Sequence, residues 1–288
     1  MLSFMERIRV VPMSAGALRR EISFRGGIRG KNHAHEATYG RMPCVVFQET
    51  EQGLHGNFLD FSYQAILGRP EWARRLTKAY TAGRWVPRRG DRERCELDCA
   101  NSSDALLMNV FCYPGMLEHG PLCSLLGVER GAVPVFGYKP RAPMQGSATD
   151  RTEVDMLLGN LLVEAKLTEG SFQTAPMERV MRYCGLEEVF DVDELPVTDG
   201  VLQSYQLVRG VMAAWAGGRS FAVFCDARRV DLVERWFQVM RAVRSCDLRS
   251  RLALVTWQEI AGVVPGMVRG FLGEKYGIFG LGGALCAS

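Results

Sequence analysis

EVDMLLGNLLVEAKLTEGSF, residues 153–172, contains two short apolar runs on either side of Gly159-Asn160. Apolar runs of this length predict buried strands, and a Gly-Asn pair between them favours a tight hairpin turn. The second run ends in charge, at Glu164 and Lys166. Charges at the end of a buried strand are costly without a partner. The stretch therefore predicts a hairpin that carries a functional site at its end.

Strand alternation places Glu164 and Lys166 on one face and Ala165 on the other. Asp155, on the preceding strand, becomes their neighbour if the turn sets the register. Two adjacent carboxylates repel each other and call for a cation, and Mg²⁺ prefers oxygen ligands. The alternative is a cross-strand ion pair on an exposed face, worth about 0–1 kcal/mol. The apolar lead-in favours a covered sheet, and hence the metal site.

The rest of the chain predicts an α/β protein with a mixed sheet, because the hairpin is antiparallel and the later crossovers favour parallel pairing. Apolar periodicity and turn residues place the elements. We expect strands at 132–138, 152–158, 161–167, 220–226 and 251–257, and helices at 56–81, 101–113, 201–217, 229–244 and within 264–276.

Asp155, eight intervening residues and then Glu164-Ala165-Lys166 resemble the active-site signature of the PD-(D/E)XK, or restriction-endonuclease-like, nuclease superfamily. Gln206, with Leu207 and Arg209, resembles the glutamine-bearing helix behind this site in many members. The resemblance covers roughly residues 100–226 and implies an α-β-β-β-α-β core flanked by helices, with extra N-terminal helices. The proline of the signature is missing, since Glu153-Val154 precede the aspartate.

This resemblance implies Mg²⁺-dependent hydrolysis of phosphodiester bonds in DNA, with Mn²⁺ as a substitute ion and RNA as an alternative substrate. Asp155, Glu164 and the carbonyl oxygen of Ala165 would hold the ion, and Lys166 would position the attacking water. Gln206 would hydrogen-bond within the site; the alternative is that it only solvates a helix. A catalytically silent nucleic-acid- or protein-binding module on the same fold is the rival function.

Two basic segments are candidate phosphate-binding surfaces. Residues 1–42 carry eight Lys/Arg against three acidic residues, and we expect a flexible basic arm there. Residues 69–94 carry nine against three, including Arg84, Arg88 and Arg89. Arg209, on the predicted helix, is a further candidate for a phosphate contact. The alternative for residues 69–94 is a solvated helix face and loop, and the alternative for Arg209 is that it only solvates its helix.

Composition and cysteine usage set the remaining expectations. The 288 residues, 47% hydrophobic and 23% charged, predict a globular chain, with one domain over 43–288 and a catalytic core at about 100–260. Nine scattered cysteines indicate reduced thiols in a cytoplasmic protein. Cys95 and Cys99 are a weaker candidate for a metal-thiol site. No membrane span is expected. A homodimer is also expected as a way to make two cuts in DNA.

Overall fold

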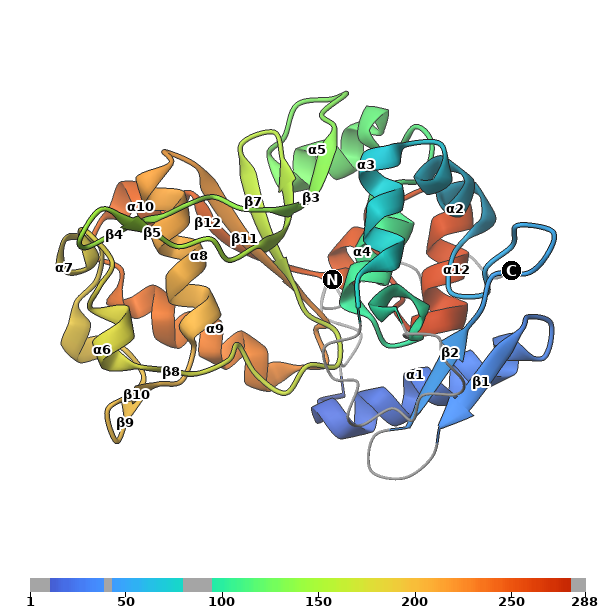
Figure 1. Cartoon of the computed structure of the whole chain (residues 1–288), viewed down its shortest axis with the longest axis horizontal. Helices are drawn as coiled ribbons and strands as arrows, with labels where there is room; N and C mark the ends of the chain where they lie inside the picture. Colours follow the sequence, from blue (N-terminus) through green and yellow to red (C-terminus); the bar gives the residue numbers. More distant parts are fainter. Residues whose placement is uncertain (1–10, 39–42, 80–94, 281–288) are drawn as a thin grey trace, which may run out of the picture. The chain divides into compact units, whose positions relative to one another are not determined.

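The computed structural model of the chain describes residues 11–38, 43–79 and 95–280. These residues divide into two compact units. Unit 1 takes in the described residues up to 132, together with 226–228 and 256–280, and unit 2 takes in residues 133–225 and 229–255. Figure 1 labels the elements of both units.

Unit 2 is built on a five-stranded mixed sheet (Figure 1). Its strands lie in the order β12-β11-β7-β6-β3. The pairs β3–β6 and β6–β7 are antiparallel, whereas β7 and β11 are parallel. This is the mixed sheet that the sequence predicts. The strands are β3 (Pro134–Tyr138), β6 (Val154–Leu158), β7 (Leu161–Ala165), β11 (Ser220–Cys225) and β12 (Leu252–Thr256).

The hairpin between β6 and β7 turns at Gly159-Asn160, as predicted. Gly159 has a φ of +56°, a left-handed conformation that glycine adopts without strain. Met156 pairs with Val163, and Leu158 pairs with Leu161. The same register, continued by one residue, sets Asp155 opposite Glu164.

The other elements of unit 2 surround this sheet, and α8 packs on β7 and β11. Ten consecutive residues of α8, 205–214, are buried, so the helix is enclosed rather than amphipathic. The elements are β4 (Pro143–Met144), β5 (Ala148–Thr149), β8 (Ala175–Pro176), α6 (Met177–Val180), α7 (Leu186–Val189), β9 (Val197–Thr198), β10 (Val201–Leu202), α8 (Tyr205–Ala216), α9 (Val230–Ala242) and α10 (Cys246–Ser250).

Unit 1 is mainly helical, with one small hairpin of β1 and β2. Helix α4 begins at the N-cap Ser102, whose side chain accepts a hydrogen bond from the Ala105 N–H. The elements are α1 (Ala15–Gly30), β1 (His35–Thr38), β2 (Cys44–Phe47), α2 (Asp60–Leu67), α3 (Pro70–Ala73), α4 (Ser103–Phe111), α5 (Gly120–Leu126), α11 (Trp257–Val263) and α12 (Gly266–Tyr276).

Helix α1 corrects the expectation of a flexible arm over residues 1–42. Its buried positions are Leu18, Ile22, Gly26 and Gly30, four residues apart. Two of these are glycines, so the buried face of the helix does not produce a periodic pattern of hydrophobic residues in the sequence. A Cβ at Gly26 would lie 3.2 Å from that of Ala100, which explains why a small residue stands there.

None of the helices in the described part of the chain combines the length and the apolar character needed to cross a membrane.

The contact between α8 and β11 gives a first test. A Cβ added at Gly210 would lie 2.3 Å from the ring of Phe221, which is fully buried. Gly210→Ala should therefore lower the free energy of unfolding by about 1–3 kcal/mol, measured by urea denaturation. The control is Gly270→Ala in α12, where a Cβ meets nothing within 4 Å. That change should raise stability by about 0.5–1 kcal/mol. Equal effects of the two substitutions would contradict the packing described.

Candidate functional site

The charged residues of the hairpin meet at the end of β7. The main-chain N–H of Ala165 donates to Asp155 Oδ2 at 2.7 Å, so the Asp155 carboxylate lies against β7. The predicted register, with Asp155 beside Glu164, is thus confirmed. Because the N–H and C=O of a strand residue point to the same side, the Ala165 carbonyl is directed to the side on which Asp155 lies.

Glu164 is the centre of the polar network. It is only 2% exposed. Its Oε1 accepts hydrogen bonds from Lys166 Nζ at 2.7 Å and from Gln206 Nε2 at 2.8 Å. Its Oε2 lies 3.4 Å from Arg209 Nη2. A carboxylate at this depth requires such partners, and the chain supplies them from β7 and from α8.

Lys166 is buried among carboxylates. Burial alone would lower the pKa of its ammonium group, but Glu164, Glu169 and Asp155 together raise that pKa above its ordinary value. Lys166 is therefore a cation at neutral pH. Its Nζ lies 5.9 Å from the centre of the Phe172 ring, a contact compatible with an attraction between the cation and the ring.

Helix α8 is anchored at its first turn, which fixes the side chains that reach Glu164. The N–H groups of Tyr205 and Gln206 donate to the carbonyls of Gln173 and Phe172 at 3.1 and 2.9 Å. Gln206 and Arg209 lie three residues apart, hence on one helix face, and both contact Glu164. The sequence therefore places Gln206 correctly beside this carboxylate.

Two buried atoms of this network have no hydrogen-bond partner among the described residues. They are Oε1 of Gln206 and Nε of Arg209. Buried polar atoms are normally satisfied, and an unpaired one is accounted for by strain, an ordered water or a bound ion. The Gln206 oxygen is an acceptor and fits a cation or a donor.

Arg209, a predicted candidate for a phosphate contact, lies within the Glu164 network. It is 5% exposed, and its Nη2 also donates to the main-chain carbonyl of Glu153 at 3.0 Å. The guanidinium thus ties α8 to the start of β6 and to Glu164. The other predicted nucleic-acid-binding residues, Arg84, Arg88 and Arg89, lie outside the described residues.

The described part of the basic segment 69–94 is partly paired within unit 1. Arg75 Nη2 and Lys78 Nζ both contact Oδ2 of Asp104 at 2.7 Å. Asp104 stands in the first turn of α4 and is buried. Burial alone would raise the pKa of its carboxyl, but the two cations lower it overall. These two basic side chains stabilise the unit rather than lie free for a phosphate.

The described residues contain no group of three or more His, Cys, Asp or Glu side chains placed to hold a metal ion. Cys95 and Cys99 thus lack the further ligands of a metal-thiol site within the described ranges; the Cys99 thiol lies 3.9 Å from the Cys95 carbonyl. At the end of β7, a metal would need main-chain or amide oxygen in addition to the two carboxylates.

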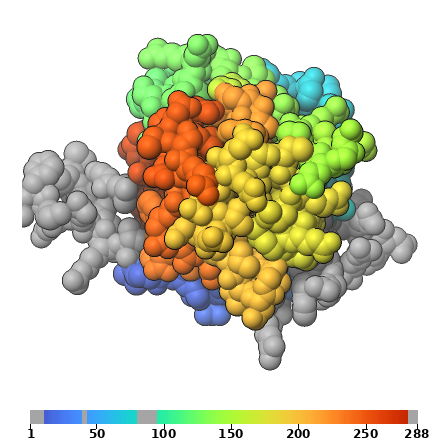
Figure 2. Space-filling view, turned by 90° about the vertical axis from the view of Figure 1, so that its left-hand side faces the viewer, coloured from blue at the N-terminus to red at the C-terminus, as the bar shows by residue number. Residues whose placement is uncertain are grey.

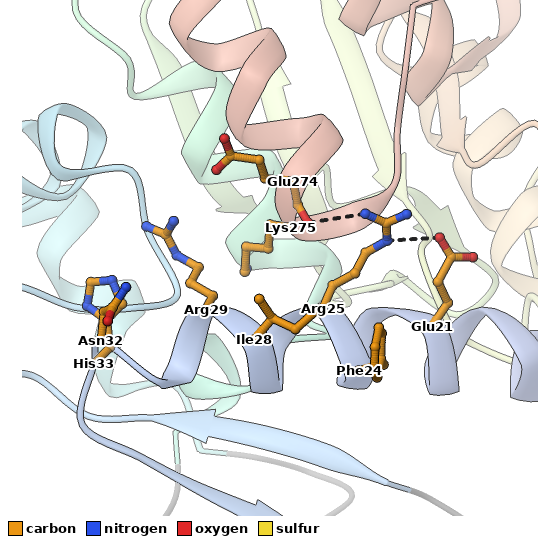
Figure 3. A pocket seen from close by; sticks show the side chains of 9 residues that line it. All are labelled: Glu21, Phe24, Arg25, Ile28, Arg29, Asn32, His33, Glu274 and Lys275. Atoms are coloured by element: carbon orange, nitrogen blue, oxygen red, sulfur yellow. Dashed lines mark hydrogen bonds and ion pairs between the residues drawn. The ribbon is translucent and has the colours of Figure 1, made fainter.

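A hollow of about 620 Å³ in unit 1 lies between α1 and the end of α12 (Figure 3). Its arginines are engaged within the protein. Arg25 pairs with Glu21 at 3.0 Å (Figure 3). It also donates to the carbonyls of residues 273 and 274. Arg29 donates to the carbonyls of Gly56 and Phe58. These contacts attach α1 to its unit, and we assign no ligand to this hollow.

A second buried network near the site escapes sequence reasoning. The Tyr183 hydroxyl donates to Asp150 Oδ2 and lies 3.0 Å from the hydroxyl of Tyr205, the first residue of α8. Asp150 Oδ1 accepts from the Thr152 N–H at 2.8 Å. The three principal residues are far apart in the sequence and belong to no shared motif, so only the fold brings them together.

The mixed sheet with its hairpin, flanked by helices, defines a restriction-endonuclease-like fold. Residues 29–277 match the family described as Restriction Endonuclease associating with ARP, and since this is most of the 288 residues, the chain belongs to that family. Searches of the curated proteins and of the solved structures found no match.

The Glu164 network predicts a measurable loss of stability when its charge is removed. Glu164→Gln would leave Lys166 and Arg209 buried without their shared carboxylate, at a cost of about 3–5 kcal/mol in the free energy of unfolding. The control Glu178→Gln changes an exposed side chain of α6 and should alter stability by less than about 0.5 kcal/mol. Chemical denaturation at pH 7 measures both. Equal stabilities of the two variants would contradict the network.

Proposed function

We propose that this chain is a metal-dependent nuclease of the PD-(D/E)XK type that hydrolyses phosphodiester bonds in DNA. The observation that carries the proposal is the meeting of Asp155 and Glu164 across the hairpin, with Lys166 Nζ 2.7 Å from Glu164. Membership of a restriction-endonuclease family supports it. A mere structural ion pair would not need the second carboxylate of Asp155 at the same strand end.

The oxygen atoms at this strand end fit a hard divalent cation such as Mg²⁺, or Mn²⁺ as its substitute. Asp155 and Glu164 would hold it with the Ala165 carbonyl. Oε1 of Gln206, which has no hydrogen-bond partner among the described residues, is a further oxygen close to Glu164. A bound ion of this kind would supply Lewis acidity and a nucleophilic water near neutral pH.

The charge balance also favours a cation. Three carboxylates, those of Asp155, Glu164 and Glu169, act on Lys166. Within this group Lys166 and Arg209 are the two cations in contact with Glu164. Carboxylates that converge at one strand end repel each other, and an added cation would reduce that repulsion.

Lys166 would act as a fixed positive charge in the reaction. Nζ would donate hydrogen bonds to the attacking water or to a phosphate oxygen. Gln206 would hold Glu164 in place from α8, and Arg209 would hold it from the opposite carboxylate oxygen.

The substrate and the partner follow from the family. Restriction-endonuclease likeness favours DNA, with RNA as the alternative substrate. The family description includes association with ARP, and we propose the same association for this chain. A homodimer, which would place two such sites on one duplex, stays a prediction.

A second candidate function is a binding module on the same fold that does not cut. The burial of Glu164 and its three donors favours it, because the network satisfies the carboxylate without a metal. A module of this kind would bind DNA or a protein and release no product. The cleavage assay described next decides between the two.

Lys166→Ala should reduce DNA cleavage at least about 100-fold, because it removes the charge held for the transition state. The assay incubates linear and circular DNA with wild type in Mg²⁺ or Mn²⁺, and EDTA should stop the wild-type reaction. Arg241→Ala, which removes an exposed cation of α9, is the control and should cut at the wild-type rate. If wild type and Lys166→Ala give identical products and rates, the nuclease proposal fails.

A further inference from the structure

Two hollows of unit 2 share a basic lining that the sequence did not single out. One has a volume of about 530 Å³ and the other about 400 Å³, and Thr149 and Arg151 line both. We call this the 139–182 basic surface. Its cations are Lys139, Arg141, Arg151, Arg179 and Arg182.

All five of these side chains are exposed, and none forms an ion pair with a carboxylate in the described part of the chain. The acid that lines the larger hollow, Asp150, is itself engaged. It is 8% exposed, its Oδ1 accepts from Thr152, and its Oδ2 accepts from Tyr183. The surface therefore presents positive charge that the protein does not neutralise locally.

The segments that carry these cations are fixed to one another. The Gln145 N–H donates to the carbonyl of Arg182 at 2.8 Å, and the Cys184 N–H donates to that of Pro143 at 3.1 Å. Residues 139–153 (yellow-green) and α6 (yellow) accordingly lie side by side in Figure 2. The main-chain segments that carry the cations are thus held next to one another.

The same face is attached to the helix that carries the site. Tyr183 reaches the hydroxyl of Tyr205 at 3.0 Å, and the Arg179 guanidinium lies 4.8 Å from the centre of the Tyr205 ring. Tyr205 precedes Gln206 in α8. Arg151 stands four residues before Asp155, a span of at most about 14 Å in an extended chain. That distance equals about four base pairs of a DNA duplex.

We propose that the 139–182 basic surface binds the sugar–phosphate backbone of DNA beside the bond that is cut. This proposal rests on the proposed function, because a bond is cut only if the chain is a nuclease. Phosphate contacts of this kind fix the position of the duplex without reading its sequence. The surface would thereby set which phosphate reaches Asp155 and Glu164.

The chemistry of the lining favours a nucleic acid over an acidic protein. Met144 is the sole apolar side chain among the described residues that line the two hollows. Protein partners usually bury an apolar core, whereas nucleic-acid interfaces are polar and strongly basic. An acidic protein is the competing occupant, and competition with poly-glutamate tests for it.

The test compares Arg151→Ala/Arg182→Ala with wild type by fluorescence anisotropy of a labelled 30-base-pair duplex. EDTA is present, so that binding is measured without cleavage. We expect the Kd at 100 mM NaCl to rise at least about 10-fold. The slope of log K against log salt should fall by about two, because two phosphate contacts are lost.

Three controls make the result specific. Arg235→Ala/Arg241→Ala removes the same charge from α9 and should bind like wild type. Arg151→Lys/Arg182→Lys keeps the charge and should restore most of the affinity. Unchanged melting temperatures verify folding, which is expected because both arginines are exposed.

Each outcome separates this proposal from the nuclease proposal. If DNA binding depends on Arg151 and Arg182 but the protein does not cut DNA, the result supports DNA binding by the 139–182 basic surface and contradicts the nuclease function. Cleavage by wild type with no change of affinity in Arg151→Ala/Arg182→Ala overturns the surface alone. Equal losses in the α9 control also overturn it. So does displacement of the DNA by poly-glutamate at equal charge, since that would show affinity for any polyanion.

Discussion

The buried carboxylate of Glu164 constrains the rest of unit 2. A negative charge that is 2% exposed at the end of a central strand needs donors from every side. Lys166 directly follows the same strand, and Gln206 and Arg209 come from α8. Helix α8 must therefore lie close on the sheet, and Gly210 permits this approach over the Phe221 ring. Packing against Phe221 and charge compensation of Glu164 thus both require α8 to lie close on the sheet.

The site could be predicted from the sequence because it lies on a hairpin. Two apolar runs and a Gly-Asn turn fix both the strands and their register, and alternation then decides which side chains converge. The five strands of the mixed sheet and the longer helices also follow from periodicity, because these elements are long enough to show a period, whereas elements of two to four residues such as β8 and α6 are not. Gln206 could be placed because the resemblance to a nuclease superfamily assigned this residue to the helix behind the site.

Other features could not be predicted, for identifiable physical reasons. Helix α1 buries glycines at two of its four core positions, so its period is invisible to a hydrophobic pattern. The sequence could not show that Arg209 is buried, because only the fold encloses α8. The Asp150, Tyr183 and Tyr205 network, like the basic surface beside it, joins residues distant in the chain, and tertiary contacts alone assemble it.

The central claim is that Asp155 and Glu164 form one metal-binding site at the end of the hairpin. The most direct measurement is a crystal structure of the protein soaked in Mn²⁺, with anomalous diffraction data to locate the ion. We expect an anomalous peak within coordination distance of oxygen atoms from both carboxylates and of the Ala165 carbonyl. A structure with no peak there, in which Glu164 remains bound by Lys166, Gln206 and Arg209, would contradict the account.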